Sequence, residues 1–217
     1  MGSKAEGRLL ITDMDGTIND YSRRRAACWK AVTGKDYEGN IRKLDIEGSL
    51  TTYQYEVYLR LFFSEEGAFT RLDTPLPSAP EILTYFYIAR GLRIVYLTGR
   101  LSGEDGIGLH DTMNWLTEHK FPVPNNREVY LFNRNNPEKD DLQSKRDDME
   151  HVLELGNPAV GIGDKPCNAI IYVEHGIRVL SFIHPRWEDP DKITEYPPET
   201  IFVRDWQEIK RKVGEFL

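Results

Sequence analysis

The stretch "LLITDMDGTIND", residues 9–20, runs from an apolar segment straight into two aspartates. We predict a buried strand that ends where Asp13 begins. Asp13 and Asp15 are two positions apart, so along an extended chain their carboxylates would lie on one face and repel each other. A pair of this kind is expected chiefly where a cation or a proton transfer makes use of it.

Further apolar segments alternate with stretches of helical pattern along the rest of the chain. The predicted strands are 92–97, 128–132, 159–163, 177–182 and 200–203, and the predicted helices are 79–90, 110–120, 145–156 and 167–176. Strands that alternate with helices form βαβ units, which build a parallel sheet with right-handed crossovers. We therefore predict an α/β fold with a Rossmann-like, three-layer core around a parallel sheet.

The alternation stops in one part of the chain, residues 19–74. This part contains two helix-like segments, 23–34 and 50–63, and no strand alternates with them. A proline-rich segment then restarts the core pattern. We predict that 19–74 form a small helical cap insertion, and that 1–18 and 75–217 together form the core.

Composition narrows the class of protein. The chain has 217 residues, 40% of them hydrophobic, which is enough to bury a substantial core. Its formal net charge of −7 argues against a general affinity for nucleic acid. No apolar run approaches the roughly 20 residues of a membrane helix, and the first residues lack the apolar region of a signal peptide. Cys28 and Cys167 lie far apart and suggest no disulfide framework, so we expect a soluble, cytoplasmic protein.

Polar residues stand where the predicted strands end, which is the edge at which parallel sheets bind ligands. They are Asp13, Asp15, Thr98, Gly99, Arg100, Asp164 and Asn168. Lys145 belongs to the predicted helix that precedes the strand at 159–163. Carboxylates, a hydroxyl and an amine at one edge suit an anionic group held against Mg²⁺, which prefers oxygen ligands.

These motifs resemble those of the haloacid dehalogenase-like hydrolase superfamily, which consists mostly of Mg²⁺-dependent phosphatases and phosphotransferases. "DMDGT" at 13–17 matches the first motif, and Thr98 in "YLTGR" matches the second. Lys145 is the best candidate for the lysine of the third motif. The fourth, often Gly-Asp-x-x-x-Asp, appears as "GDKPCN" with Asn168 in the last place. The resemblance spans the core from about Leu9 to Phe182 and excludes the insertion.

The resemblance implies a mechanism. Asp13 would attack phosphorus and form an aspartyl-phosphate, and Asp15 would protonate the leaving oxygen and then deprotonate water. Mg²⁺ would be bound by Asp13, the Asp15 carbonyl and Asp164. The predicted substrate-binding residues are Thr98, Gly99, Arg100 and Lys145. For Arg100, a solvent-facing position is an equal alternative.

Several alternatives stay open. Lys139 and Lys165 compete with Lys145 for the phosphate contact, and the arginines at 23–25 are interpreted as a solvated helix face. The leading function is hydrolysis of a small phosphorylated metabolite. Part of the chain, "LTGR…T..WL", also looks like the phosphatase domain of polynucleotide kinase-phosphatases, which would make it a nucleic-acid 3′-end phosphatase. A haloacid dehalogenase is disfavoured because its nucleophile stands without a partner like Asp15.

Overall fold

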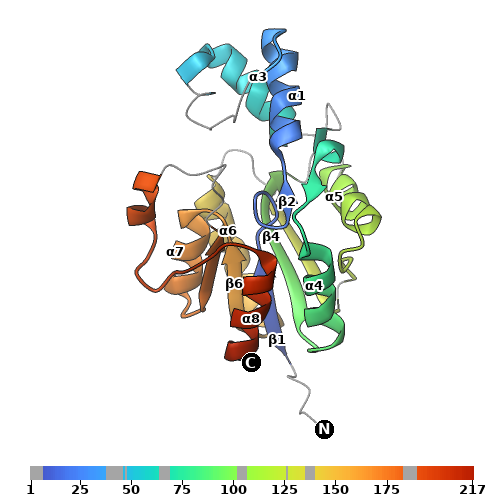
Figure 1. Ribbon diagram of the computed structural model, residues 1–217, viewed down its shortest axis with the longest axis vertical. Helices are drawn as coiled ribbons and strands as arrows, with labels where there is room; N and C mark the ends of the chain where they lie inside the picture. Colours follow the sequence, from blue (N-terminus) through green and yellow to red (C-terminus); the bar gives the residue numbers. More distant parts are fainter. Residues whose placement is uncertain are drawn as a thin grey trace.

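The protein is described here as a computed structural model that covers residues 7–37, 46, 48–63, 69–101, 107–125, 127–134, 140–182 and 190–217. Six strands form its central sheet: β1 (Arg8–Thr12), β4 (Arg93–Leu101), β5 (Val129–Arg134), β6 (Asn157–Gly163), β7 (Val179–Phe182) and β8 (Ile201–Val203). Their spatial order is β5-β4-β1-β6-β7-β8, and every neighbouring pair is parallel (Figure 1). The reversal of strand order beside β1 places Asp13 where such sheets bind ligands.

Helices cover both faces of the sheet. They are α4 (Ala79–Ile88), α5 (Ile107–Glu118), α6 (Asp141–Leu155), α7 (Pro166–Glu174) and α8 (Trp206–Phe216), with a short 3₁₀ helix η2 at Pro190–Glu195. Alternate residues of β1 belong to the two different cores: Leu10 packs with α4, α5 and α8, whereas Leu9 and Ile11 pack with α6 and α7. The predicted three-layer, Rossmann-like parallel sheet is confirmed. None of the described helices is long and apolar enough to cross a membrane.

Helix α8 was not predicted from the sequence, although a signal for it exists. The Asp205 side chain caps the helix by accepting a hydrogen bond from the Glu208 amide, and Glu208 in turn accepts from the Arg204 amide. Trp206 is buried, and its indole N–H donates to the Thr17 carbonyl at 2.9 Å. Helix α8 therefore contacts the loop that follows β1 and helps to hold it in place.

The remaining elements lie beyond the carboxyl ends of the strands (Figure 1). They are β2 (Asn19–Asp20), α1 (Ser22–Thr33), α3 (Thr52–Phe63), the 3₁₀ helix η1 (Phe69–Leu72) and β3 (Thr74–Pro75). Strands β2 and β3 form an antiparallel ribbon, and α1 packs against α3 around a separate cluster that includes Cys28, Tyr58 and Phe62. No described residue between β2 and β3 belongs to the six-stranded sheet. The division of the chain at 19 and 74 stays a prediction, and the ribbon lies at those two positions.

Two local expectations are corrected by the structure. Strand β4 extends to Leu101, so Thr98, Gly99 and Arg100 belong to the strand instead of following it. The register with β5 shifts between Thr98 and Leu101, which marks an irregular strand end. Helix α6 begins at Asp141 after an Asp140 cap, so Lys145 lies within the helix and does not open it.

Candidate active site

Asp13 directly follows the central strand β1 and is almost completely buried, with 1% of its surface exposed. Its backbone N–H donates to the Ile162 carbonyl of β6 at 2.9 Å, which continues the sheet pairing through this residue. Its Oδ1 accepts from the Met14 amide at 2.8 Å, and its Oδ2 accepts from Asn168 Nδ2 at 2.8 Å. Lys145 Nζ lies 3.3 Å from the same Oδ2. The carboxylate is held in one orientation by charge and by hydrogen bonds.

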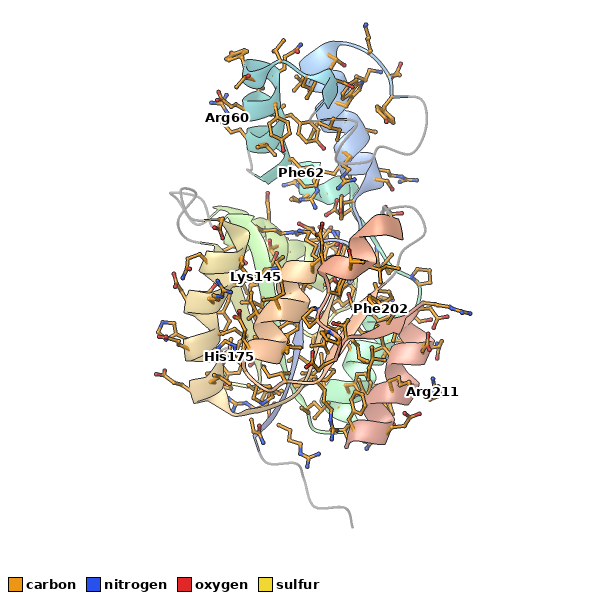
Figure 2. The ribbon with its side chains drawn as sticks, turned by 90° about the vertical axis from the view of Figure 1, so that its left-hand side faces the viewer. Arg60, Phe62, Lys145, His175, Phe202 and Arg211 are labelled. Atoms are coloured by element: carbon orange, nitrogen blue, oxygen red, sulfur yellow. The ribbon has the colours of Figure 1, made fainter. Side chains whose placement is uncertain are left out.

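Lys145 and Asn168 act on Asp13 as a pair. Lys145, which is labelled in Figure 2, is 2% exposed. Its Nζ donates to Asn168 Oδ1 at 2.7 Å, so the amide bridges the lysine and the aspartate. Asn168 fits here because the neighbouring position is Gly163, where a Cβ would come within 2.6 Å of Asn168 Nδ2. Of the competing lysines, Lys165 precedes α7 as its cap residue and Lys139 lies outside the described residues.

The turn after Asp13 requires a glycine. The Met14 carbonyl accepts from the amides of Thr17 at 3.0 Å and Ile18 at 2.9 Å, which closes the turn. Gly16 has a φ of +82°, a left-handed conformation that L-residues rarely adopt. A Cβ on Gly16 would also come within 2.1 Å of Asp164 Oδ2. The glycine of the motif therefore lets the Asp164 carboxylate approach the backbone of the loop.

Replacing Gly16 by alanine tests both reasons for a glycine here, which are the left-handed backbone and the close approach of Asp164. We expect Gly16→Ala to lose about 1–2 kcal/mol of unfolding free energy through the left-handed backbone, with a further loss as Asp164 is displaced. Gly34→Ala is the matched control, because Gly34 has a φ of +72° and open space around it. Urea unfolding with and without Mg²⁺ measures both variants. Equal stability losses, with the same response to Mg²⁺, would contradict the close approach of Asp164.

Asp164 brings a second carboxylate to the loop after β1. Its Oδ1 is buried and has no hydrogen-bond partner. Burial, helped by the negative charge of Asp13 and opposed by the positive charge of Lys165, raises the pKa of this carboxyl to about 7. A cation beside Oδ1 would relieve both effects. A buried carboxylate oxygen without a partner is therefore the observation that argues for a metal here.

The oxygen donors at this site fit Mg²⁺. Among the described residues, no group of three or more His, Cys, Asp or Glu side chains is placed to hold a metal ion. Mg²⁺ does not need such a group, because it is commonly bound by one or two carboxylates together with water and substrate phosphate. Asp13 and Asp164 would supply those carboxylates, with the Asp15 carbonyl as the predicted third ligand.

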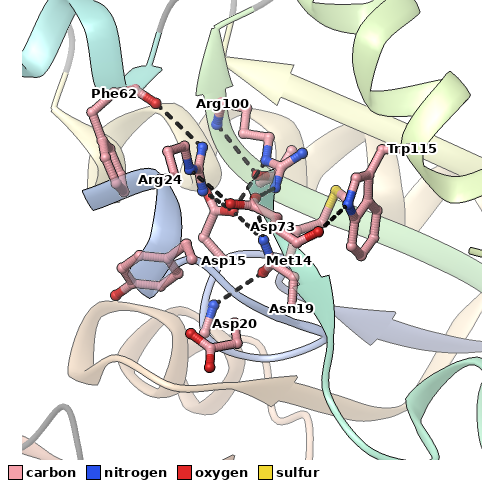
Figure 3. Close-up of polar contacts among 12 residues, drawn as sticks. Met14, Asp15, Asn19, Asp20, Arg24, Phe62, Asp73, Arg100 and Trp115 are labelled. Atoms are coloured by element: carbon pink, nitrogen blue, oxygen red, sulfur yellow. Dashed lines mark hydrogen bonds and ion pairs between the residues drawn. The ribbon is translucent and has the colours of Figure 1, made fainter. Parts of the chain in front are cut away.

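Asp15 lies in a buried cluster of charges (Figure 3). Its Oδ1 accepts from Arg24 Nη2 at 2.6 Å, from Arg100 Nη2 at 2.6 Å and from Asn19 Nδ2 at 3.0 Å. Asp73 completes the cluster: its Oδ2 accepts from Arg100 at 2.8 Å and from Asn19 at 2.6 Å. Arg24 Nε lies 3.1 Å from Asp73 Oδ1. Two arginines thus face two carboxylates.

The two carboxyls of this cluster differ in their pKa. Burial alone would raise the pKa of Asp15, but the positive charges of Arg100 and Arg24 outweigh burial and hold this pKa well below its usual range. For Asp73 burial dominates and raises the pKa to about 6 in spite of the same arginines. Asp15 therefore keeps its charge to a lower pH than Asp73 does.

Comparison with known proteins rests on structure alone, since no family model and no curated protein matches the chain by sequence. A predicted phosphatase from Clostridium acetobutylicum superposes with a TM-score of 0.66 at 13% identity, covering 96% of this chain and 99% of its own. A haloacid dehalogenase-like family hydrolase from Streptococcus pneumoniae gives 0.62 at 13% identity, covering 95% and 98%. This chain has the haloacid dehalogenase-like fold. Protein Tyrosine Kinase A of Mycobacterium tuberculosis shares the fold too, with a TM-score of 0.69, 15% identity and coverage of 98% and 100%.

The haloacid dehalogenase-like fold brings the predicted site residues into two adjoining groups. Asp13 and Lys145 form the first with Asn168, and Asp15 and Arg100 belong to the charge cluster. Thr98 is buried, and its Oγ1 accepts from the Arg100 amide at 3.3 Å, which joins it to the second group. Gly99, between Thr98 and Arg100, is half-buried in the same strand end.

The structure excludes one of the two alternatives for Arg100 and corrects the interpretation of the arginines at 23–25. Arg100 does not face solvent, because it is 3% exposed and paired with Asp15. The solvated face predicted for 23–25 holds for Arg23, which is exposed, but fails at Arg24, which is completely buried. A signal was present, since Arg24 lies four residues before the buried Cys28 and so shares its helix face.

Asp73 was missed because it belongs to no motif. Its two carboxylate oxygens engage both arginines of the cluster, and its carbonyl accepts from the Trp115 indole at 3.1 Å. The residue directly precedes β3, at the point where the chain returns to the core. An isolated aspartate beside prolines is typical of a turn, so only its tertiary contacts reveal that it is part of the site.

Proposed function

We propose that this protein is a Mg²⁺-dependent phosphomonoester hydrolase that forms an aspartyl-phosphate on Asp13. The observation that supports this most is the environment of the Asp13 carboxylate. It is oriented by Lys145 and Asn168, and it lies near a second carboxylate, Asp164, with an unpartnered oxygen. Such an arrangement suits a nucleophile that must meet a phosphate without being repelled by it.

The reaction divides into two displacements. Asp13 attacks phosphorus, the phosphorus–oxygen ester bond breaks, and the departing oxygen takes a proton from Asp15. Water, losing a proton to Asp15, then attacks the aspartyl-phosphate and releases phosphate. Lys145 and the Thr98 hydroxyl would bind the phosphate oxygens through both steps. Mg²⁺ bound at Asp13 and Asp164 would neutralise negative charge between nucleophile and phosphate.

The environment of Asp15 fits the second step directly. Asp15, held by Arg24 and Arg100, is in the ionised form that the second step requires, and the same ion pairs lower its basicity while they are in place. The first step needs the protonated form, so at least one of the two ion pairs must loosen before the leaving oxygen is protonated. We take this as a requirement of the mechanism that the arrangement of the cluster imposes.

A small phosphorylated metabolite is the substrate class that we favour. Helices α1 and α3 lie beyond the carboxyl end of the sheet, where a cap formed by residues 19–74 would limit entry to small molecules (Figure 1). Trp115, part of the resemblance to end-processing phosphatases, is buried and bonded to the Asp73 carbonyl, so it does not offer a surface for stacking a base. The net charge of −7 also argues against a nucleic-acid substrate.

A substrate screen tests this proposal. Phosphate release is measured with a panel of small phosphorylated metabolites and with a 3′-phosphorylated oligonucleotide. Chloride release is measured separately with a 2-chloro acid. We expect turnover of one or more small phosphomonoesters, loss of turnover with excess chelator, and recovery with Mg²⁺. Full activity in excess chelator would refute the metal assignment, and turnover of the oligonucleotide alone would refute the substrate class.

A further inference from the structure

Arg24 connects the two parts of the molecule through a single buried side chain. It lies on α1 with 0% of its surface exposed, although this helix stands outside the six-stranded core. Its Nη2 is 2.6 Å from Asp15 Oδ1 and its Nε is 3.1 Å from Asp73 Oδ1. Asp15 follows the first strand of the core, and Asp73 precedes the return to it. One guanidinium therefore touches the chain where it leaves the core and where it comes back.

The other contacts of Arg24 are with the helices themselves. Its Nη1 donates to the Phe62 carbonyl at 3.2 Å, near the end of α3, and its guanidinium carbon lies 4.3 Å from the centre of the Phe62 ring (Figures 2 and 3). Phe62 also packs edge-on against Tyr21, which directly precedes α1. Arg24 is thus fixed by both helices, so its guanidinium has to move whenever they move together.

The loop that carries Asp15 is coupled to the same point. Asn19 in β2 donates to both Asp15 Oδ1 and Asp73 Oδ2, and its carbonyl accepts from the Gly16 amide. Asp15 therefore has partners from α1, from the β2 ribbon and from β4. Only the partner from α1, Arg24, belongs to the pair of helices. A shift of these helices would change the contacts of Asp15 through Arg24 first.

We propose that Arg24 is a positioning residue through which the placement of α1 and α3 sets the orientation of the Asp15 carboxylate. The inference rests on the proposed function, in which Asp15 handles the proton. With Arg24 in place, Oδ1 is bound and the carboxylate is fixed. When the helices move and carry Arg24 with them, Oδ1 keeps Arg100 and Asn19 as partners, and the carboxylate loses the orientation that Arg24 sets.

The test compares Arg24→Gln, Arg24→Lys and the control Arg23→Gln, which changes an exposed neighbour on the same helix. Turnover is measured with p-nitrophenyl phosphate, whose leaving group needs little protonation, and with glycerol 2-phosphate, whose alkoxide needs it. A misplaced Asp15 should cost the second substrate at least roughly tenfold more kcat/KM, which reports the step that expels the leaving group, than the first. Arg24→Lys, which keeps the charge, should recover part of that ratio. Arg23→Gln should match the wild type.

Hydrogen exchange of the three variants provides a readout that does not depend on activity. In Arg24→Gln, the amides of residues 14–19 and of α1 should exchange faster, with those of β4 and β6 unchanged. A parallel fall of kcat/KM for both substrates, or unchanged exchange at 14–19, would overturn the role of Arg24. If the wild type hydrolyses neither substrate, the proposed function fails, and faster exchange at 14–19 would still support the coupling of Arg24 to the loop.

Discussion

Asp13→Asn is expected to abolish phosphomonoester hydrolysis and to leave no phosphoenzyme, whereas Asp15→Asn is expected to accumulate one. An amide is a very poor nucleophile, so the first variant cannot form the covalent intermediate. The second keeps the nucleophile but loses the group that deprotonates water. Because proton transfer contributes about 10²–10⁴-fold, Asp15→Asn should be slowed by that factor. Acid quenching during turnover of p-nitrophenyl phosphate, followed by mass measurement of the intact chain, detects the phosphoenzyme.

The charge cluster adds a second expectation for Asp15→Asn. Removing one partner of a buried ion pair leaves uncompensated charge and costs about 3–5 kcal/mol in other proteins. Here Arg24 and Arg100 would keep Asp73 as their described carboxylate partner, so this variant should unfold at a clearly lower temperature than the wild type. The turnover of the two variants is therefore compared at a temperature below the unfolding transition of each. Equal loss of activity without a trapped intermediate in Asp15→Asn would mean that the two roles are wrongly assigned.

Asp164→Asn is expected to abolish the response to Mg²⁺ while it stabilises the metal-free protein. The variant should lose about a thousandfold in turnover, because metal ions contribute several kcal/mol of transition-state stabilisation. Mg²⁺ at 100 times its dissociation constant should stabilise the wild type by about 2.7 kcal/mol and the variant not at all. Thermal unfolding with and without Mg²⁺ measures this. Asp36→Asn, at an exposed position, is the control and should respond to Mg²⁺ like the wild type.

The pH dependence of the same measurement follows from the raised pKa of Asp164. In the folded, metal-free chain this carboxyl keeps its proton up to about pH 7, but in the unfolded chain it loses it near 3.8. The folded state binds more protons between these values, so the contribution of Asp164 to stability falls as the pH rises through this window. The advantage of Asp164→Asn should therefore be larger at pH 8 than at pH 5. An advantage that does not grow with pH would contradict a buried, unpartnered carboxylate.

Local sequence was sufficient for the sheet and for the loop after its first strand. The alternation of apolar segments with helical patterns predicts the parallel sheet, because each strand and each helix must bury its apolar side against its neighbours. "DMDGT" predicts the turn, and the reason lies within a few residues: Gly16 has a positive φ, and Met14 closes the turn with its carbonyl. Helix α8, with its capping pair Asp205 and Glu208, was equally within reach of the sequence.

The charge cluster was decided only by tertiary structure. Asp15 meets Arg24 nine positions away and Arg100 85 positions away, and Asn19 meets Asp73 across 54 positions. Charged side chains are usually exposed, so from the sequence alone a helical arginine is expected to face water. Arg24 and Arg100 are buried here because the fold brings two carboxylates to the same place.

The choice among three lysines has the same origin. Spacing alone allowed Lys139, Lys145 or Lys165, and only the packing of α6 beside α7 brings the amine of Lys145 to Asn168 and Asp13. A short sequence motif reflects the backbone conformation of a few neighbouring residues. Which distant charges neutralise one another depends on how whole elements pack. The sequence by itself therefore determined the sheet and the Asp13 loop, and the tertiary structure decided the partners of Asp13 and Asp15, because those partners come from distant elements that only packing brings together.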